Sequence, residues 1–478
     1  MRTHLITLIN VMLIASMAGC TNIPADLGRS DVADLLLDRG HAEAGGDLDV
    51  SQLLQNPLDR QTAVTIALIN NPELQTTYAK LGFGAADLYR AARIRNPVFE
   101  GAWLDSDEAS AGNLVTLGLA VSFTDLLTLR ARRRLSESQL AVLKMSIGGD
   151  VLTMVQETES AFYDYLVKKQ ISNLRERTSK TGSLSAALAQ RLREAGNLSP
   201  RELAIEESIA SEARLVSFSA QASAWSARVS LANLLGISVA DDWEVQSQIR
   251  EPLKQEDDLE DLVRIAKQTR LDLLAAQAQA DMLVDKYDVV GWSRWVAGLE
   301  GGVEREREPD GEELTGPTLH WELPVFSQRK DRDYQVQADL TIAAQELRQK
   351  HILVENQVRL AYAAVQNAKS RVREYQEVLI PQRKKVVARG QEEVNFMLIG
   401  IFELLALKQQ EYDSYQGYFE SVRDYWQARS SLAQAVGRRL PSGDSDASPP
   451  IDLRQFFESD TSTSHEHHHS SAKAGGAQ

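Results

Sequence analysis

Apolar and polar residues alternate with a period of two in two separate stretches of the chain. In the first stretch, Val115 to Phe123, apolar residues occupy every second position, and small or polar residues fill the positions between them. The second stretch, Leu319 to Val325, alternates in the same way. This period is typical of β-strands with one apolar face, so each stretch predicts a strand.

A candidate partner strand precedes each stretch. These partners are Val98 to Leu104 and Trp295 to Val303, and the intervening loops, residues 105–113 and 304–317, are polar and acidic. The sequence thus predicts two β-hairpins with strands of ~9–11 residues, the length that crosses a membrane when tilted. The alternative is a hairpin on a soluble domain with one face packed on a core. Four strands cannot close a barrel, so strands that span a membrane require closure by other chains.

A seven-residue apolar repeat follows each predicted hairpin. It runs from Leu340 to Tyr375, with a companion set four residues on, and a weaker version runs from Leu140 to Ala161. This spacing predicts coiled-coil helices over about residues 127–195 and 328–390. Each helix would be roughly 95–100 Å long, which is typical of a filament or a tall tube. Pro381 is expected to kink or break the second helix.

Each long helix ends in a short turn and is followed by a returning helix. Gly196, Asn197 and Leu198 break the first helix, and Ser199 to Glu202 forms a capping box with Pro at the first helical position. Val394, Asn395 and Phe396 begin the corresponding second turn. Glu392 and Glu393 lie just before it, either as an acidic ring where several subunits meet or as an ordinary exposed pair.

The two parts of the chain repeat each other at a nearly constant offset. Glu202-Leu203 is matched by Glu403-Leu404, which is 403 − 202 = 201 residues later, and Ser230 to Asn233 is matched by Ser431 to Gln434. We therefore predict an internal two-fold repeat, with copies at residues 58–240 and 259–440 and a linker at 241–258. Each copy consists of a strand hairpin followed by a long helical hairpin.

The N-terminus has the features of a secretory signal. An apolar run from Leu5 to Ala15 is too short to span a bilayer, and Met17-Ala18-Gly19-Cys20 resembles a lipoprotein cleavage box. We predict a signal peptide at 1–19 and a lipidated Cys20, the only cysteine; ordinary cleavage with an incidental thiol is the alternative. Residues 20–57 are expected to form a polar, extended arm. Thr21-Asn22 lacks the aspartate that signals inner-membrane retention, which favours the outer membrane.

Composition and charge exclude several functions. The net charge of −15 argues against nucleic acid as a partner. The chain lacks a phosphate-binding loop, a CxxC pair and a nucleophile elbow, so we expect neither an enzyme nor a cofactor. Residues 441–478 are expected to be a largely disordered tail. Its histidines bind metal weakly or have no metal role, and the sequence leaves both open: His465, His467, His468 and His469.

Together these features resemble the outer-membrane efflux proteins of the TolC type, over residues 58–441. The resemblance rests on the duplicated plan, the cleavage box, the turns Arg193 to Leu198 and Val394 to Met397, and Leu231 to Gly236, which closes the first copy. It implies a homotrimer in which each protomer contributes four transmembrane strands to a 12-stranded β-barrel. It also implies a periplasmic α-barrel of helical hairpins that docks a periplasmic adaptor and an inner-membrane pump. Thr124, where the family commonly has proline, is a departure.

This resemblance implies a passive exit duct anchored by lipid in the outer membrane and extending into the periplasm. His320 and Glu322 would face its lumen, and Glu392 and Glu393 would lie at its gate. The return from Met397 to Leu405 is similar to relatives linked with copper or other heavy metals, so metal cations are one candidate substrate. Multidrug efflux and type I secretion are alternatives. A non-channel coiled-coil lipoprotein is a further hypothesis, against which the alternation in both hairpins argues.

Overall fold

The computed structural model describes residues 25–40, 49–105, 112–293, 296, 298–323, 330–443 and 448–452. These residues are mainly helical, with one four-stranded and one two-stranded sheet. The chain divides into two compact units, each assembled from three separate segments. Unit 1 comprises Met1–Asp38, Gln75–Asp150 and Arg270–Leu353, and unit 2 comprises Arg39–Leu74, Val151–Thr269 and Val354–Gln478.

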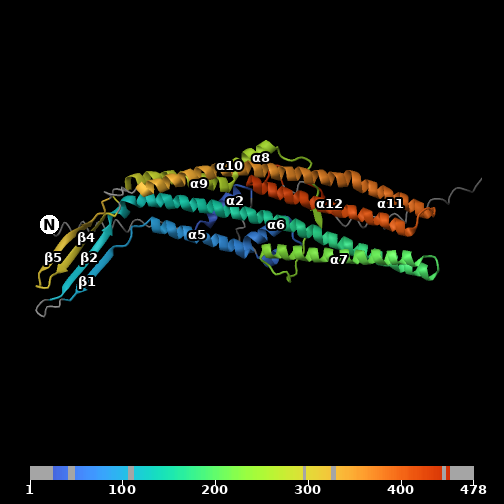
Figure 1. Ribbon diagram of the computed structural model, residues 1–478, viewed down its shortest axis with the longest axis horizontal. Coiled ribbons are helices and arrows are strands. Elements are labelled where there is room, and N and C mark those ends of the chain that lie inside the picture. The colour runs from blue at the N-terminus through green and yellow to red at the C-terminus, as the bar shows by residue number, and fades with distance from the viewer. Residues whose placement is uncertain are drawn as a thin grey trace, which may run out of the picture. The chain divides into compact units, whose positions relative to one another are not determined.

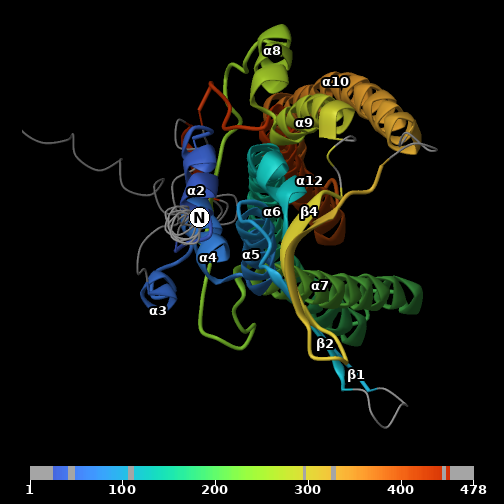
Figure 2. The ribbon, with the colours of Figure 1, turned by 90° about the vertical axis from the view of Figure 1, so that its left-hand side faces the viewer.

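Unit 1 contains an antiparallel four-stranded sheet with the order β1-β2-β4-β5 (Figures 1 and 2). The strands are β1 (Val98–Leu104), β2 (Leu114–Ser122), β4 (Glu300–Arg307) and β5 (Glu313–His320). β1 and β2 form one hairpin, β4 and β5 form the other, and β2 pairs with β4. The outer strands β1 and β5 therefore each leave one edge unpaired within the described part of the chain.

The helical part of unit 1 contains α2 (Arg29–Leu37) and α9 (Leu271–Ser293). It also takes most of α5 (Pro72–Ala91) and the beginnings of α6 (Phe123–Glu194) and α10 (Lys330–Arg373). Asp272 forms ion pairs with Arg270 at 2.8 Å and with Lys350 at 3.3 Å. Burial raises the pKa of Asp272, but the hydrogen bond and charge of Arg270 and the charge of Lys350 lower it more, so its pKa falls below the ordinary value.

Unit 2 is built on two long helical hairpins. The first pairs the later part of α6 with α7 (Pro200–Leu235), and the second pairs α11 (Ile380–Asn395) with α12 (Ile401–Val436). Shorter elements complete the unit: α3 (Val50–Leu53), α4 (Arg60–Asn70), α8 (Leu259–Thr269), and the strands β3 (Gln248–Arg250) and β6 (Pro450–Asp452), which pair antiparallel.

The core of unit 2 follows α12. Aromatic and aliphatic side chains at helical spacing on α12 are buried and form a core contact: Tyr415, Tyr418, Val422, Tyr425 and Trp426. The heptad positions of α10 are also buried in this unit: Val354, Val358, Val365, Ala368 and Val372. The apolar stripe of each helix therefore supplies most of its packing energy.

A buried polar network attaches the segment between the two helical hairpins to α12. Arg429 and Glu256 form an ion pair in which both side chains are at most 5% exposed. Tyr425 donates its hydroxyl proton to Glu256 at 2.6 Å and accepts the backbone N–H of Leu253 at 3.0 Å. Burial, followed by the hydrogen bond to Glu256, raises the pKa of Tyr425. Removing one member would leave buried charge or a buried donor without its partner.

The helix that leads into the second hairpin is interrupted where Pro381 predicted a kink. Between α10 and α11 the backbone forms a π-helical segment, η1 (Glu374–Leu379). Proline lacks the N–H that a regular helical turn requires, and an inserted residue accommodates this loss. Tyr375, within η1, lies against the backbone of Gly417 on α12, where an added Cβ would overlap the Tyr375 ring.

Three expectations from the sequence are wrong in detail, and a fourth, the largely disordered tail, is refined by a short strand. The second hairpin uses Glu300–Arg307 and Glu313–His320, so most of the loop predicted at 304–317 is strand, and Trp321 to Leu323 lies beyond it. The strands are 7 to 9 residues long, not 9 to 11. The N-terminal arm is not wholly extended, because α2 buries Val32 and Leu36. The predicted tail contains β6.

None of the helices in the described part of the chain combines the length and the hydropathy that a bilayer-spanning helix requires.

Candidate channel wall and docking turns

The four-stranded sheet has one apolar face. Register places the alternate residues of all four strands on this face, and their side chains are exposed: Phe99, Trp103, Leu117, Leu119, Val121, Val303 and Leu319. Trp103 is 71% exposed and Phe99 is 69% exposed, so no other described element of the chain covers this surface. A large exposed apolar surface of this kind marks a membrane or protein interface.

The opposite face of the sheet carries small and acidic residues, together with four apolar ones, Val98, Leu104, Leu114 and Leu314. Glu100 on β1 and Glu304 on β4 both pair with Gly118 on β2, so these two carboxylates lie in one row across the sheet. Gly316 on β5 pairs with Glu304 and completes the row. Because the glycines carry no side chain, the carboxylates are the only side chains in this row.

The neighbouring rows of this face add further acidic groups. Glu306 pairs with Thr116, and Glu300 pairs with Ser122 and with His320. The arginines of β4, in contrast, lie on the apolar face near the β4–β5 turn, where Arg305 forms an ion pair with Glu313. Among the described strand residues, this face therefore carries four glutamates and His320, without lysine or arginine.

His320 thus occupies the polar face of the sheet, the side that the sequence assigned to a lumen. Glu322 follows the last residue of β5 and is not part of a strand. Its side chain approaches Gly298, where an added Cβ would lie 3.1 Å from the Glu322 Cβ. The structure therefore brings His320, but not Glu322, into the sheet.

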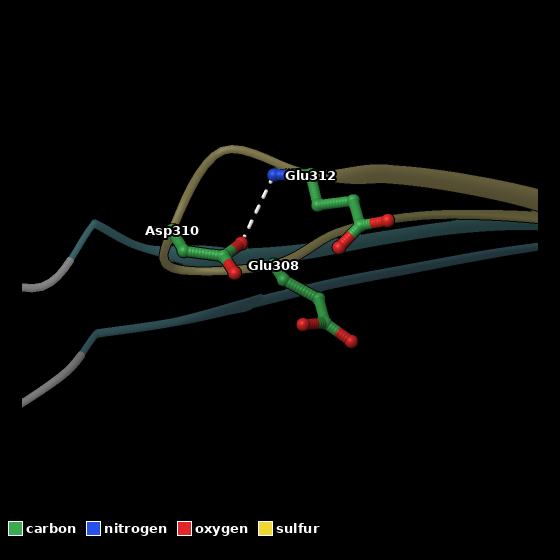
Figure 3. Close-up of side chains that lie close together, drawn as sticks. All are labelled: Glu308, Asp310 and Glu312. Atoms are coloured by element: carbon green, nitrogen blue, oxygen red, sulfur yellow. Dashed lines mark hydrogen bonds between the residues drawn. The ribbon is translucent and has the colours of Figure 1, made fainter.

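The turn between β4 and β5 gathers three more carboxylates, from Glu308, Asp310 and Glu312, with oxygens within 4.8 Å of one another (Figure 3). The backbone explains this arrangement. The N–H of Glu308 donates to the carbonyl of Glu312 at 2.9 Å, and the N–H of Glu312 donates to Asp310 Oδ1 at 3.0 Å. Asp310 therefore stabilises a tight hairpin turn, and we assign the cluster to that turn.

Two turns were predicted to dock the periplasmic adaptor, and we call them the docking turns. The first docking turn, between α6 and α7, ends α6 with a left-handed glycine. Gly196 has φ +80°, and the N–H of Asn197 donates to the Leu192 carbonyl at 2.8 Å. This is the bond pattern of a Schellman cap. Leu198 is half-buried, and Gly196 and Asn197 are exposed.

The predicted capping box at the start of α7 is confirmed. The Ser199 hydroxyl accepts the N–H of Glu202, and the Glu202 carboxylate accepts the N–H of Ser199 at 2.8 Å. These hydrogen bonds from Ser199 lower the pKa of Glu202. Pro200 takes the first position of α7.

The second docking turn, between α11 and α12, has the same bond pattern with different residues. The N–H of Leu398 donates to the Glu393 carbonyl at 2.8 Å, and Met397 has φ +58°. At the predicted offset of 201, Met397 corresponds to Gly196, so a methionine occupies the left-handed position. Val394 and Asn395 belong to the last turn of α11, and the turn itself begins at Phe396.

The second turn also exposes a run of large apolar side chains. Phe396, Met397 and Leu398 are 76%, 92% and 73% exposed. Glu392 and Glu393 are exposed beside them, and Glu392 forms an ion pair with Arg389 at 2.7 Å. The two docking turns lie at the same end of unit 2 (Figure 1). One turn is therefore polar and the other apolar.

Other predicted site residues lie outside the described residues: Cys20, His465, His467, His468 and His469. Sequence reasoning missed two groups that the structure brings together. The glutamates of the polar face were missed because Glu304 to Arg307 looked like an acidic loop, although its strict alternation of charge signals a strand. Met397 and Leu398 were placed at the second turn by the sequence but were not named as docking residues, although the offset of 201 from Gly196 and Asn197 could have identified them.

Neither a protein-family model nor a curated protein sequence matches the chain. Solved structures match its fold closely. The chain superposes on the outer membrane channel CmeC of Campylobacter jejuni with a TM-score of 0.66 at 12% identity, over 84% of this chain and 89% of that one. For CusC, whose structures concern transmembrane channel formation, the TM-score is 0.64 at 16% identity, over 79% and 92%.

The outer membrane protein VceC of Vibrio cholerae gives a TM-score of 0.63 at 13% identity, over 81% of this chain and 96% of that one. At these TM-scores and coverages, the three proteins share the fold of this chain. The chain therefore has the fold of the TolC-type outer membrane efflux channels.

Proposed function

We propose that this protein is the outer-membrane exit duct of a tripartite efflux system. It conducts its substrate passively from a periplasmic adaptor and an inner-membrane pump to the exterior. The single observation that carries the proposal is the sheet of unit 1, with an exposed apolar face, an acidic face and unpaired edges at β1 and β5. Such a sheet is stable in lipid only when its edges are paired.

Closure by two further copies of the chain satisfies this requirement. Three copies of a four-stranded sheet give a 12-stranded barrel, in which β5 of one protomer pairs with β1 of the next. The apolar face then contacts lipid, and the acidic face lines a water-filled lumen. A lipid anchor at Cys20 and docking of the adaptor at the two turns of unit 2 belong to the same proposal.

The acidic face supports cations as the substrate class. In a trimer, the row of Glu100, Gly118, Glu304 and Gly316 becomes a ring in which glutamates alternate with glycines. Rings of carboxylates favour cations in channels, because each cation that enters is attracted by several negative charges at once. Heavy-metal cations such as copper fit this lumen, and the histidine-containing tail adds imidazole ligands near the end of the chain.

The test is conductance in a planar bilayer, together with the mass of the purified protein in detergent. We expect a trimer that forms a pore, with a reversal potential in a potassium chloride gradient that indicates preference for potassium over chloride. A monomer without conductance would refute the proposal, and a trimer with an anion-selective pore would refute the assignment of the lumen.

Substitutions in the sheet sharpen this test. The double variant E100Q/E304Q removes the carboxylates of one row and keeps the size of each side chain, so we expect the cation preference to fall toward none. The matched control is E313Q, which removes a carboxylate from the opposite face of the same sheet. We expect this control to keep the cation preference of the unmodified protein. An equal loss in both variants would contradict the proposed orientation of the sheet.

A further inference from the structure

An open groove lies at the C-terminal end of α5, within unit 1. Its volume is about 720 Å³. One part of its lining is apolar, formed by Leu27, Ala85, Ala86, Tyr89 and Ile94, and another part is basic, formed by Arg90, Arg93 and Arg95. A groove with an apolar floor and guanidinium groups at its rim fits a ligand that has both a hydrocarbon part and an anionic head.

Two of these arginines keep their positive charge available. The Arg93 guanidinium stacks on the Tyr89 ring at 3.6 Å from its centroid, and no carboxylate among the described residues pairs with it. Arg90 pairs with Asp87 at 3.3 Å, but both side chains are more than half exposed, so this pair is weak. A ligand phosphate would therefore meet two guanidinium groups that are free to reorient.

Arg95 has a structural role instead. Its Nε lies 2.7 Å from Asp125 Oδ2 and its Nη2 lies 3.1 Å from Asp125 Oδ1, and the Asp125 side chain is buried. Arg132 also approaches Asp125, and it donates to the Arg93 carbonyl at 3.4 Å. These contacts fix the end of α5 against the start of α6 and so hold the shape of the groove.

The end of α5 and the start of α6, which these contacts join, are strongly basic, although the chain as a whole has a net charge of −15. Residues 87–95 and 125–137 contain seven arginines and only three carboxylates, and those three pair with Arg90, Arg95, Arg132 and Arg133. A basic cluster in an acidic protein has an electrostatic function more often than one in a protein of balanced charge.

The groove also lies directly before the sheet in the sequence. β1 begins at Val98, three residues after Arg95, and its apolar-face residue Phe99 follows at once. If the sheet spans the outer membrane, as proposed above, this segment lies at the level of the lipid headgroups on the periplasmic side. We propose that the groove binds an anionic phospholipid, with the phosphate on Arg90 and Arg93 and an acyl chain along Ala86, Tyr89 and Ile94.

The second copy of the repeat provides a built-in control. At the start of α10, which corresponds to the start of α6, Lys330 and Arg332 alternate with Asp331 and Asp333, so the charges cancel. The basic cluster at the start of α6 therefore belongs to the first copy only and is not a general requirement of the strand-to-helix junction.

The test uses the purified full-length chain in a neutral detergent, titrated with phosphatidylglycerol, phosphatidylcholine or inorganic phosphate, with bound lipid counted by native mass spectrometry. We expect phosphatidylglycerol to bind about 25-fold more tightly than phosphatidylcholine, since each of the two arginines contributes about fivefold near an anionic lipid headgroup. Inorganic phosphate at the same concentration is expected not to displace it, because phosphate lacks the acyl chain.

Variants separate the parts of the groove. R90Q/R93Q is expected to abolish the preference for phosphatidylglycerol, R90K/R93K to keep most of it, and A86E to reduce it by placing a carboxylate in the groove. The control K330Q/R332Q is expected to bind like the unmodified protein. Circular dichroism and native mass show that each variant is folded and assembled.

Equal binding of the two lipids, or an unchanged preference in R90Q/R93Q, would overturn the inference. Displacement by inorganic phosphate would overturn the assignment of a phospholipid as the ligand, because it would show that the groove is a simple anion site. These outcomes are distinct from a failure of the proposed duct. A protein that conducts ions but does not prefer phosphatidylglycerol refutes only the groove, and a protein that prefers this lipid but does not conduct refutes only the duct.

Discussion

The two docking turns each have one residue with a left-handed backbone, a methionine in one and a glycine in the other. Exchanging the residue type at each of these positions measures the backbone strain there. Met397 has φ +58° and is 92% exposed, so its side chain gains almost no packing energy in return for its left-handed backbone. A residue with a Cβ loses roughly 1–2 kcal/mol in this conformation, and glycine does not. Glycine in turn gains about 0.5–1 kcal/mol of freedom in the unfolded chain. We expect Met397→Gly to stabilise the closed turn by about 0.5–1 kcal/mol.

The matched substitution is Gly196→Ala in the first turn. Gly196 has φ +80°, and an added Cβ would find no atom within 4 Å, so the whole effect comes from the backbone. We expect Gly196→Ala to destabilise that turn by about 1 kcal/mol. The two variants should therefore have opposite signs although both change one exposed turn residue.

The assay is native-state hydrogen exchange, because local opening of a turn does not require the whole chain to unfold. The informative amides are Leu398, bonded to the Glu393 carbonyl, and Asn197, bonded to the Leu192 carbonyl, each at 2.8 Å. A change of about 1 kcal/mol corresponds to roughly a fivefold change in exchange rate. We expect slower exchange at Leu398 in Met397→Gly and faster exchange at Asn197 in Gly196→Ala. Unchanged or faster exchange at Leu398 in Met397→Gly would refute the reasoning.

Two further substitutions test packing and charge. Gly417→Ala should push the Tyr375 ring away from α12 and destabilise the second hairpin by about 1–3 kcal/mol, which thermal unfolding would measure, and Tyr375→Ala in the same background should recover part of the loss. Arg270 and Lys350 outweigh the effect of burial and lower the pKa of Asp272 in the folded chain. The ionised Asp272 therefore stabilises the folded chain at a pH above its pKa in the unfolded chain, and this stabilisation is lost as the pH falls through its pKa in the folded chain. Asp272→Asn should therefore flatten the acid side of the stability profile, and an unchanged slope of urea-measured stability between pH 5 and pH 3 would contradict this.

The helices were largely predictable because their signals are local. Helix α6 was expected over about 127–195 and is found at Phe123–Glu194, and the capping box at Ser199 and Glu202 is formed as its residue types require. The interruption at Pro381 was also predicted, because proline cannot donate its missing N–H in any environment. Coiled-coil repeats and caps depend on residues within a few turns of one another, which the sequence displays directly.

The strands of the second hairpin were predicted with the wrong bounds for a physical reason. Glu304 to Arg307 carries a charge at every position, so it looked like a loop, and the apolar pattern around Trp321 looked like a strand. In the structure, Glu304 lies between two glycines, and Arg307 lies opposite Glu313, which also pairs with Arg305. Whether such a charged segment forms a strand depends on its cross-strand partners, and these partners come from distant parts of the sequence.

The acidic row of the sheet could not be predicted for the same reason. Glu100 and Glu304 are 204 residues apart, and they share a row only because each pairs with Gly118. The groove at Arg93 is similar, since Leu27 reaches it from a segment that the sequence assigned to an extended arm. Local patterns therefore predicted the elements, and strand pairing decided which side chains act together.

Strands of 7 to 9 residues are shorter than the sequence led us to expect, and if the sheet spans the outer membrane as proposed, the distribution of arginines explains how such strands fit it. On the apolar face, the band runs from the row of Val121 to the row of Val115, six residues apart and so about 20 Å along the strand. Arg307 lies in the row of Val115 at one end of this band, and at the other end Arg90 and Arg93 precede β1, whereas Arg95 is held by Asp125. Long basic side chains at both ends extend to the headgroups and let a short apolar band match a thicker hydrocarbon layer. The arginines around the proposed lipid groove would thus compensate for short strands as well as recognise the lipid.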